Sequence, residues 1–178
     1  MNLKTDNLSI RRAKDEDISS ILKIDGLLFS SVWSPSFLRQ QLGSSHHIHS
    51  VLEIQNCIIG HSGLMVICDE GHITTVAVKH ENQGSGAGSL LLADLCRQAT
   101  ELGLTSMTLE VRVSNSKAQS LYRKFGFVPA GVRPNYYSDT NEDALIMWLD
   151  DLLDKAVQKL IKVTLDNILL VSGVKKIV

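Results

Sequence analysis

Apolar and polar residues follow two different periods along the chain, and the period changes at turn residues. At the start, a short strand at 8–11 precedes two helices, which Asp15 and Ser34 are expected to cap. Three strand-like runs come next, and they cover 49–55, 57–68 and 72–79. The first half of the chain is therefore predicted to hold two helices followed by an antiparallel meander.

The second half alternates between helices and strands. A helix is expected over 88–102, where leucine and alanine residues share one face and a glycine follows. A strand over 105–113 leads to a helix that Asn115 or Ser116 caps and that another glycine ends. Two further strands are expected near 127–132 and 144–149. Together these elements predict a mixed α/β layer.

The segment after the last strand has its own pattern. Apolar residues from Leu149 to Ile161 recur every three or four positions, which predicts an amphipathic helix. We therefore divide the chain into a domain at 1–149 and a C-terminal helical extension at 150–178. We expect the helix to pack on its own domain. The alternative is contact with a second copy or a partner, aided by apolar residues within 165–170, so the sequence leaves open a monomer or a weak dimer.

Composition narrows the class of protein. The 178 residues are 44% hydrophobic and 21% charged, which suits one globular domain and excludes disordered and collagen-like classes. The net charge of −1 gives no strong electrostatic surface for nucleic acid or an anionic membrane. Three widely spaced cysteines favour reduced thiols, and the start of the chain lacks an apolar signal core. We expect a cytoplasmic protein that recognises its partners by shape.

A glycine-rich run, Gln-Gly-Ser-Gly-Ala-Gly at 83–88, lies between a predicted strand and a predicted helix. Glycine lets backbone N–H groups approach a ligand, and the N-terminus of a helix attracts anions. Neither the dinucleotide fingerprint nor the Gly-Lys-Ser/Thr phosphate loop fits the run. Taken alone, the run is a candidate phosphate site or a turn that only connects two elements.

Two motifs further along decide between these interpretations. Leu-Glu-Val-Arg-x-x-Asn begins at Leu109, and Leu-Tyr-x-x-x-Gly-Phe begins at Leu121. With Gln-x-x-Gly-x-Gly at 83–88, they occur in the order and spacing of the GCN5-related N-acetyltransferases, which the chain resembles over about 8–149. The resemblance implies a mixed, mostly antiparallel central sheet flanked by helices. The C-terminal helix is then an addition to the family's fold.

The resemblance also implies acetyl-CoA as cosubstrate. The pyrophosphate would lie on the amides of the glycine loop, the pantetheine arm would follow the preceding strand, and a backbone N–H near Val78 would stabilise the carbonyl oxygen. Asn115 would bind the arm, or would serve only as a helix cap. The cofactor-binding residues assigned in this way are Val76, Ala77, Val78, Gln83, Gly84, Ser85, Gly86, Ala87, Gly88, Ser89 and Asn115. Because positions 84 and 85 often carry Arg or Gln in relatives, the affinity for CoA is expected to be modestly lower.

Glu110 and Tyr122 are the candidate catalytic residues. On a strand where Leu109 and Val111 face the core, Glu110 faces the opposite side, and the resemblance implies that it accepts a proton from the amine. Tyr122 would return a proton to the departing thiolate. Without the motifs, Glu110 could be an exposed carboxylate paired with Arg112, and Tyr122 could be an aromatic packing residue.

The acceptor is suggested by smaller matches. Segments near Trp33 and over 133–147 resemble the branch of ribosomal-protein-alanine N-acetyltransferases, which implies a protein N-terminus as acceptor, the N-terminal alanine of ribosomal protein S18. The residues assigned to acceptor binding are Trp33, Tyr136, Tyr137 and Glu142. Two alternatives stay open, an enzyme acting on small amines or lysine side chains and an acyl-CoA-binding module without turnover.

Three histidines, His46, His47 and His49, lie close together in the sequence. No cysteine or carboxylate stands at a spacing that would complete a metal site with them. We expect them to be solvated loop residues, and we assign no metal.

Overall fold

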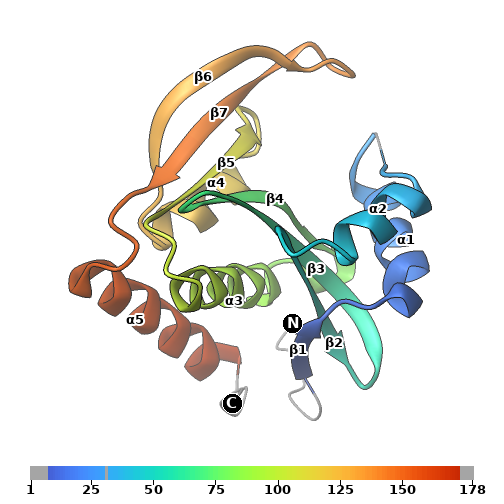
Figure 1. Ribbon diagram of the computed structural model, residues 1–178, viewed down its shortest axis with the longest axis horizontal. Helices are drawn as coiled ribbons and strands as arrows, with labels where there is room; N and C mark the ends of the chain where they lie inside the picture. The colour runs from blue at the N-terminus through green and yellow to red at the C-terminus, as the bar shows by residue number, and fades with distance from the viewer. Residues whose placement is uncertain (1–7, 31, 173–178) are drawn as a thin grey trace.

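The computed structural model describes residues 8–30 and 32–172, and within these residues seven strands form one sheet. The strands are β1 (Leu8–Arg12), β2 (His47–Ile54), β3 (Cys57–Ile67), β4 (Glu70–Val78), β5 (Ser106–Arg112), β6 (Val128–Tyr137) and β7 (Glu142–Leu149). Their order is β1-β2-β3-β4-β5-β7-β6, and every pair is antiparallel except β4 with β5. The predicted mixed, mostly antiparallel fold is confirmed (Figure 1).

Helices cover both faces of this sheet. They are α1 (Ile18–Leu28), α2 (Pro35–Leu42), α3 (Ala87–Glu101), α4 (Ser116–Lys124) and α5 (Lys155–Ser172). Val51 and Leu52 are neighbours on β2, yet Val51 packs with residues of α1 and α2 while Leu52 packs with residues of α3. Since successive side chains of a strand point to opposite faces, α1 and α2 lie on one face and α3 on the other.

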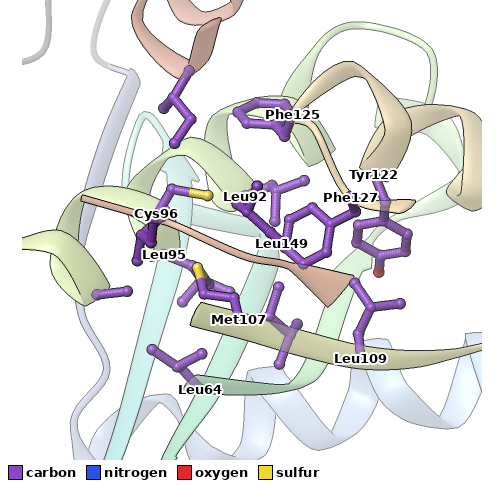
Figure 2. Close-up of a cluster of buried hydrophobic side chains, with 14 of the residues drawn as sticks. Leu64, Leu92, Leu95, Cys96, Met107, Leu109, Tyr122, Phe125, Phe127 and Leu149 are labelled. Carbon is purple, nitrogen blue, oxygen red and sulfur yellow. The ribbon is translucent and has the colours of Figure 1, made fainter. Parts of the chain in front are cut away.

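The largest core cluster lies between the sheet and the helices α3, α4 and α5 (Figure 2). Leu92 of α3 and Met107 of β5 are fully buried there, as are Phe125 just after α4 and Leu149 at the end of β7. Ile161 of α5 belongs to the same cluster. The C-terminal helix is therefore held by the same apolar contacts that fix α3 and α4 on the sheet.

Two of the predicted helix caps are present and one is wrong. The Ser34 hydroxyl accepts a hydrogen bond from Phe37 N at 3.1 Å, and Asn115, rather than Ser116, caps α4 through Ala118 N at 3.1 Å. Asp15 does not cap α1, which begins at Ile18 after a 3-10 turn over Asp15–Asp17. The carboxylate of Asp17 binds the Arg11 guanidinium instead, at 2.7 and 2.9 Å.

The three clustered histidines are not all loop residues, so that expectation is wrong. His47 and His49 lie on β2, and His49 is only 4% exposed. Its Nε2 lies 3.1 Å from Nδ1 of His61, whose Nε2 lies 2.9 Å from the carboxylate of Asp25 on α1. Because a carboxylate accepts, His61 donates from Nε2 and His49 donates to the free nitrogen of His61. The strand carries His49 inward, to a chain of buried hydrogen bonds.

The C-terminal helix begins later than the sequence indicates. Its apolar stripe was expected from Leu149, but Leu149 ends β7 and α5 starts at Lys155, where the Asp154 carboxylate accepts from Ala156 N at 2.7 Å. Leu152, in the turn between them, is fully buried. Ile161 of α5 packs in the main core cluster, which agrees with the expectation that this helix packs on its own domain. The side chains of residues 168–170 lie outside the described part.

Within residues 8–30 and 32–172, no helix combines the length and the apolar character that crossing a membrane requires.

Candidate functional site

A split in the sheet creates the site. β4 and β5 are paired from Glu70 with Ser106 to His72 with Thr108, and no further pair follows among the described residues. Just beyond this point Thr74 is an extra residue in β4, so the register against β3 shifts between Gly63 and Leu64. A bulge bends a strand and can end its pairing. Two hollows open where β4 leaves β5, an inner cavity of about 660 Å³ and an outer groove of about 1020 Å³.

The inner cavity receives residues from both faces of the sheet. Asp25 and Phe29 from the α1 side line it, and so do Ala118 and Tyr122 from α4. The outer groove lies along the glycine-rich loop and α4. Val76, Asn115 and Ala118 line both hollows. The inner cavity and the outer groove therefore meet beside the exposed edge of β4.

Glu110 lies in the wall of the inner cavity, on β5. Its side chain is 8% exposed, one carboxylate oxygen is 2.6 Å from Nε2 of His72 and the other is 3.1 Å from a guanidinium nitrogen of Arg133. His72 also lines the cavity and is 27% exposed. The predicted outward face of Glu110 is what the structure shows, and two cationic or hydrogen-bonding partners fix its carboxylate. Glu110 and His72 together can accept a proton from a group in the cavity.

Tyr122 approaches the same cavity from α4. Its ring packs edge-on against Phe127 at 5.8 Å, and Figure 2 shows its hydroxyl directed away from Phe125. The residue is 8% exposed, and burial raises the pKa of its hydroxyl above the ordinary value. The hydroxyl therefore keeps its proton at neutral pH and can donate it. The packing and functional interpretations of Tyr122 are compatible, since the ring packs while the residue lines the cavity.

Aromatic residues form part of the lining of the inner cavity. Trp33, Tyr136 and Tyr137 all line it, as the assignment to acceptor binding requires. Tyr136 and Tyr137 pack edge-on at 5.1 Å, and the Arg112 guanidinium lies over the Tyr137 ring at 4.0 Å. Burial raises the pKa of Tyr137 to about 12. These rings offer an apolar wall for a chain that enters the cavity.

The loop between β6 and β7 is tied to the sheet and to the segment after α1. Arg112 donates two hydrogen bonds to Asp139, at 3.0 and 2.8 Å, and one to Glu142 at 3.2 Å. Ser30 donates to the same Asp139 carboxylate. Hydrogen bonds from Ser30 and then Arg112 lower the pKa of Asp139, so it stays ionised. Ion pairs thus join the β6–β7 loop to β5, and the Ser30 hydrogen bond joins the same loop to the segment after α1.

Polar side chains also line the inner cavity. Asp25 lines the cavity with its carboxylate fixed by His61 at 2.9 Å. The hydroxyl of Thr75, also in the lining, is buried and has no hydrogen-bond partner among the described residues. A buried hydroxyl without a partner is costly to folding.

The outer groove has the chemistry of an anion site. Gly84 and Gly86 have φ angles of +75° and +97°, in the left-handed region that glycine occupies without strain. They line the groove with Gln83, Ser85 and Ser89 at the start of α3. The backbone there can approach a phosphate at the positive end of the helix. This geometry fits the pyrophosphate of a coenzyme A molecule.

Not every assigned residue reaches the hollows. Ala77 and Ala87 are buried, and Gly88 is not part of either lining, although a Cβ there would meet Leu121 of the groove lining at 3.4 Å. Val78 lines only the outer groove, whereas Val76 lines both hollows. An N–H near Val78 as the donor to a carbonyl oxygen therefore stays a prediction.

Glu142 has contacts of another kind. Its carboxylate accepts from Ser114 N at 2.8 Å and from Arg112 at 3.2 Å, and it is not part of the cavity lining. These hydrogen bonds lower the pKa of Glu142, and the bond from Ser114 has the largest effect. Glu142 fixes the turn between β5 and α4, so an acceptor contact by this residue stays a prediction.

Several lining residues were not anticipated. His72 and Asp25 belong to the inner cavity, and Lys117, Lys124, Thr164 and Asn167 belong to the outer groove. Helical spacing offered one signal, since Lys117, Leu121 and Lys124 are separated by four and three positions and lie near one face of α4. His72 and Asp25 carry no such signal, because only the fold brings His72 to Glu110 and Asp25 to the cavity.

Comparisons with known proteins agree with this geometry. Residues 18–127 match the acetyltransferase (GNAT) family. A proposed ribosomal protein bS18-alanine N-acetyltransferase of Bacillus subtilis is 37% identical over 79% of this chain and 94% of its own length. The Haemophilus influenzae ribosomal protein bS18-alanine N-acetyltransferase is 34% identical over 74% of this chain and 90% of its own.

A solved structure gives the same result. The crystal structure of the ribosomal-protein-S18-alanine N-acetyltransferase from Escherichia coli superposes with a TM-score of 0.75 and 28% identity, and covers 82% of this chain and 94% of that one. The split sheet, the glycine loop at the start of α3 and the sequence relatives lead to one conclusion. The chain belongs to the GNAT family of N-acetyltransferases and is a relative of its ribosomal-protein-alanine branch.

Proposed function

We propose that the protein transfers an acetyl group from acetyl-CoA to the N-terminal α-amino group of a protein. The observation that carries this proposal is the meeting of the two hollows at Val76, beside a cavity lined by both Glu110 and Tyr122. A proton acceptor and a proton donor thus lie in one cavity, next to a groove suited to a phosphate-bearing donor. An acyl-CoA-binding module without turnover would need neither side chain.

Acetyl-CoA supplies the thioester carbonyl that an amine attacks. The residues that would hold the donor are the glycine loop at 84–86, with Gln83 and Ser89, and Asn115 near the junction. The side-chain oxygen of Asn115 already accepts from Ala118 N, which leaves its amide group free to donate. The loop would hold the pyrophosphate, and the edge of β4 near Val76 would hold the pantetheine arm.

Glu110 is proposed to take the proton that the attacking amine must lose. Its carboxylate is shielded by His72 and Arg133, and His72 is the more exposed of the hydrogen-bonded pair. The proton can therefore reach Glu110 through the His72 imidazole or through one water. Arg133 keeps the carboxylate in place while this happens.

Tyr122 is proposed to give its proton to the thiolate as the new C–N bond forms and the C–S bond breaks. A thiol has an ordinary pKa of about 8.5. The pKa of Tyr122 lies above the ordinary tyrosine value, so the tyrosine is a weaker acid than the thiol. Full transfer ahead of bond cleavage would be uphill. Donation is expected to accompany the cleavage, in a site that excludes most water.

The acceptor is proposed to be the N-terminal alanine of ribosomal protein S18. The support is the relationship to enzymes that are named for this reaction, together with the aromatic wall of Trp33, Tyr136 and Tyr137. The Asp25 carboxylate in the same cavity suits an acceptor that arrives as an ammonium group.

Mass spectrometry of a peptide panel incubated with acetyl-CoA tests the proposal. The panel includes alanine-starting peptides with the S18 N-terminal sequence, the same peptides with a blocked N-terminus and an internal lysine, and free polyamines. We expect acetylation of the free N-terminal alanine in preference to every other amine. Preference for lysine side chains or polyamines would contradict the proposed acceptor.

The catalytic roles have a separate test. Glu110→Gln should lower kcat by about 10²- to 10⁴-fold, the usual loss for a general base, while calorimetry shows CoA binding nearly intact. Glu101→Gln, a change at an exposed carboxylate of α3, is the matched control. Tyr122→Phe should also slow turnover without loss of the ring packing. Normal kcat in either variant would remove that residue from the mechanism.

A further inference from the structure

The C-terminal helix borders the outer groove. Thr164 and Asn167 of α5 line the groove together with the glycine loop and α4. The match to the family ends at residue 127, so these two residues come from a part of the chain that the family match leaves out. A wall of the groove is thus built from a segment that the resemblance did not explain.

The contact between α5 and the last residue of α4 shows where α5 lies along the groove. Asn115 caps the start of α4 at the junction with the inner cavity, and Lys124 is its last residue. A helix rises 1.5 Å per residue, so these two residues are separated by roughly 13 Å along the axis. Thr164 donates from its hydroxyl to the carbonyl oxygen of Lys124 at 3.2 Å. The α5 wall is therefore at the end of the groove that lies farthest from the acceptor.

The outer groove carries positively charged side chains, and Lys124 is the one at the α5 end. Lys117 and Lys124 line the groove, and no carboxylate side chain lines it among the described residues. Neither lysine forms an ion pair with a carboxylate in that part of the chain. Ammonium groups beside an amide and a hydroxyl are suited to a phosphate.

The proposed orientation of the donor brings a phosphate to this place. Under the proposed function, the junction near Val76 would hold its thioester and the glycine loop would hold its pyrophosphate. Coenzyme A carries its adenosine 3′-phosphate at the end opposite to the sulfur. We infer that α5 forms the outer wall of the cofactor groove, where Asn167, together with Lys124, binds the adenosine 3′-phosphate. This inference rests on the proposed use of acetyl-CoA.

Packing gives α5 the fixed position that such a wall needs. Ile161 is buried in the main core cluster, and the Gln158 amide donates to the Thr100 hydroxyl of α3 at 3.0 Å. Leu160 lies where a side chain at Gly126 would meet it at 3.2 Å. Contacts with α3 and with the end of α4 thus hold Thr164 and Asn167 in place along the groove.

Calorimetry on the full chain with CoA and with 3′-dephospho-CoA tests the inference. Asn167→Asp places a negative charge where the phosphate is expected, and should weaken binding of CoA by about 10-fold, the scale of one hydrogen bond to a charged group. Binding of dephospho-CoA should change much less. Lys162→Gln changes the net charge by the same amount at an exposed residue of α5 outside the groove lining, and should leave the affinity for both ligands unchanged.

Each outcome has a distinct meaning. Asn167→Asp that behaves like Lys162→Gln, or that weakens CoA and dephospho-CoA equally, would overturn the inference. Lys124→Gln gives a second measurement on α4, and it should reduce the preference for CoA over dephospho-CoA. Wild-type protein that binds neither ligand would instead overturn the proposed function, because the inference concerns only one end of a bound molecule.

Discussion

His49 is a buried histidine whose protonation opposes folding. Burial, followed by the nearby His61 and His47, lowers its pKa from 6.5 to about 3. Between these two values the unfolded chain binds a proton at His49 and the folded protein does not. The free energy of unfolding is therefore unaffected by His49 above the pKa that this residue has in the unfolded chain. Below that pKa it falls by about 1.4 kcal/mol per pH unit for this one group.

Urea unfolding at two pH values measures this effect. From about pH 7 to about pH 5 the His49 contribution to the loss of unfolding free energy should be about 2 kcal/mol. His49→Gln retains a side chain that can donate to His61 but does not titrate, and it should show a correspondingly smaller loss. His46→Gln, at an exposed histidine, is the control. An identical pH dependence in wild type and His49→Gln would show that His49 is protonated in the folded protein.

The surroundings of Glu110 show how far sequence can take the prediction of single residues. Strand alternation was enough to place Glu110 on the face away from the core, because that inference needs only its two neighbours. His72 and Arg133 are 38 and 23 positions away, and they reach the carboxylate because β4 pairs with β5 and because β7 pairs with both β5 and β6. Residues that meet through strand pairing leave no local pattern in the sequence.

The glycine loop is the element whose conformation most directly determines cofactor binding. Gly86→Val should raise the KM for acetyl-CoA at least about 10-fold and leave the KM for the peptide nearly unchanged, because a side chain would block the backbone's approach to a phosphate. Steady-state kinetics with each substrate varied in turn measures the difference. Gly86 lines the groove, so the added side chain is in the path of the donor.

The control for this change is Gly103→Val. Gly103 also has a positive φ, +74°, and follows the opposite end of α3 with no atom within 4 Å of an added Cβ. A valine there has comparable backbone strain and lies outside both hollows. Equal increases in the KM for acetyl-CoA in the two variants would show that strain, and not access of the phosphate, is responsible.

The elements themselves were largely predictable, while the split between two of them was not. Caps at Ser34 and Asn115, and glycines after α3 and α4, fixed most helix ends from local signals. The bulge at Thr74 depends on how β4 pairs with β3, and its consequence is the separation of β4 from β5. Periodicity could place both strands, but it could not indicate where their pairing stops.

At the scale of the whole molecule, α5 should be a structural part of the protein. Truncation after Asp150 removes Leu152 and Ile161 from the core, and loss of a large buried aliphatic side chain costs about 2–5 kcal/mol. We expect the melting temperature to fall by roughly 10 °C or more and the mass in solution to stay unchanged. Scanning calorimetry and light scattering measure the two properties.

A point variant keeps this test informative if the truncated chain does not fold. Ile161→Ala should lower the melting temperature, whereas Leu153→Ala, at a residue 49% exposed, should have little effect. A truncated protein of unchanged stability would contradict packing of α5 on its own domain. Loss of a dimer with a stable remaining core would indicate that α5 contacts a second copy. The apolar stripe predicted that α5 packs against something, but only the fold identifies α3 and α4 as its neighbours.

The split in the sheet also bears on how the two proposed substrates would reach the site. The inner cavity is lined from the α1 side as well as from α4, whereas the outer groove is lined by the glycine loop, α4 and α5. Under the proposed function the two reactants would occupy separate hollows that share only Val76, Asn115 and Ala118. This arrangement predicts that either reactant can bind first. Under the proposed function, a protein acceptor would insert only its first residues into the inner cavity, while the rest of that chain stays outside.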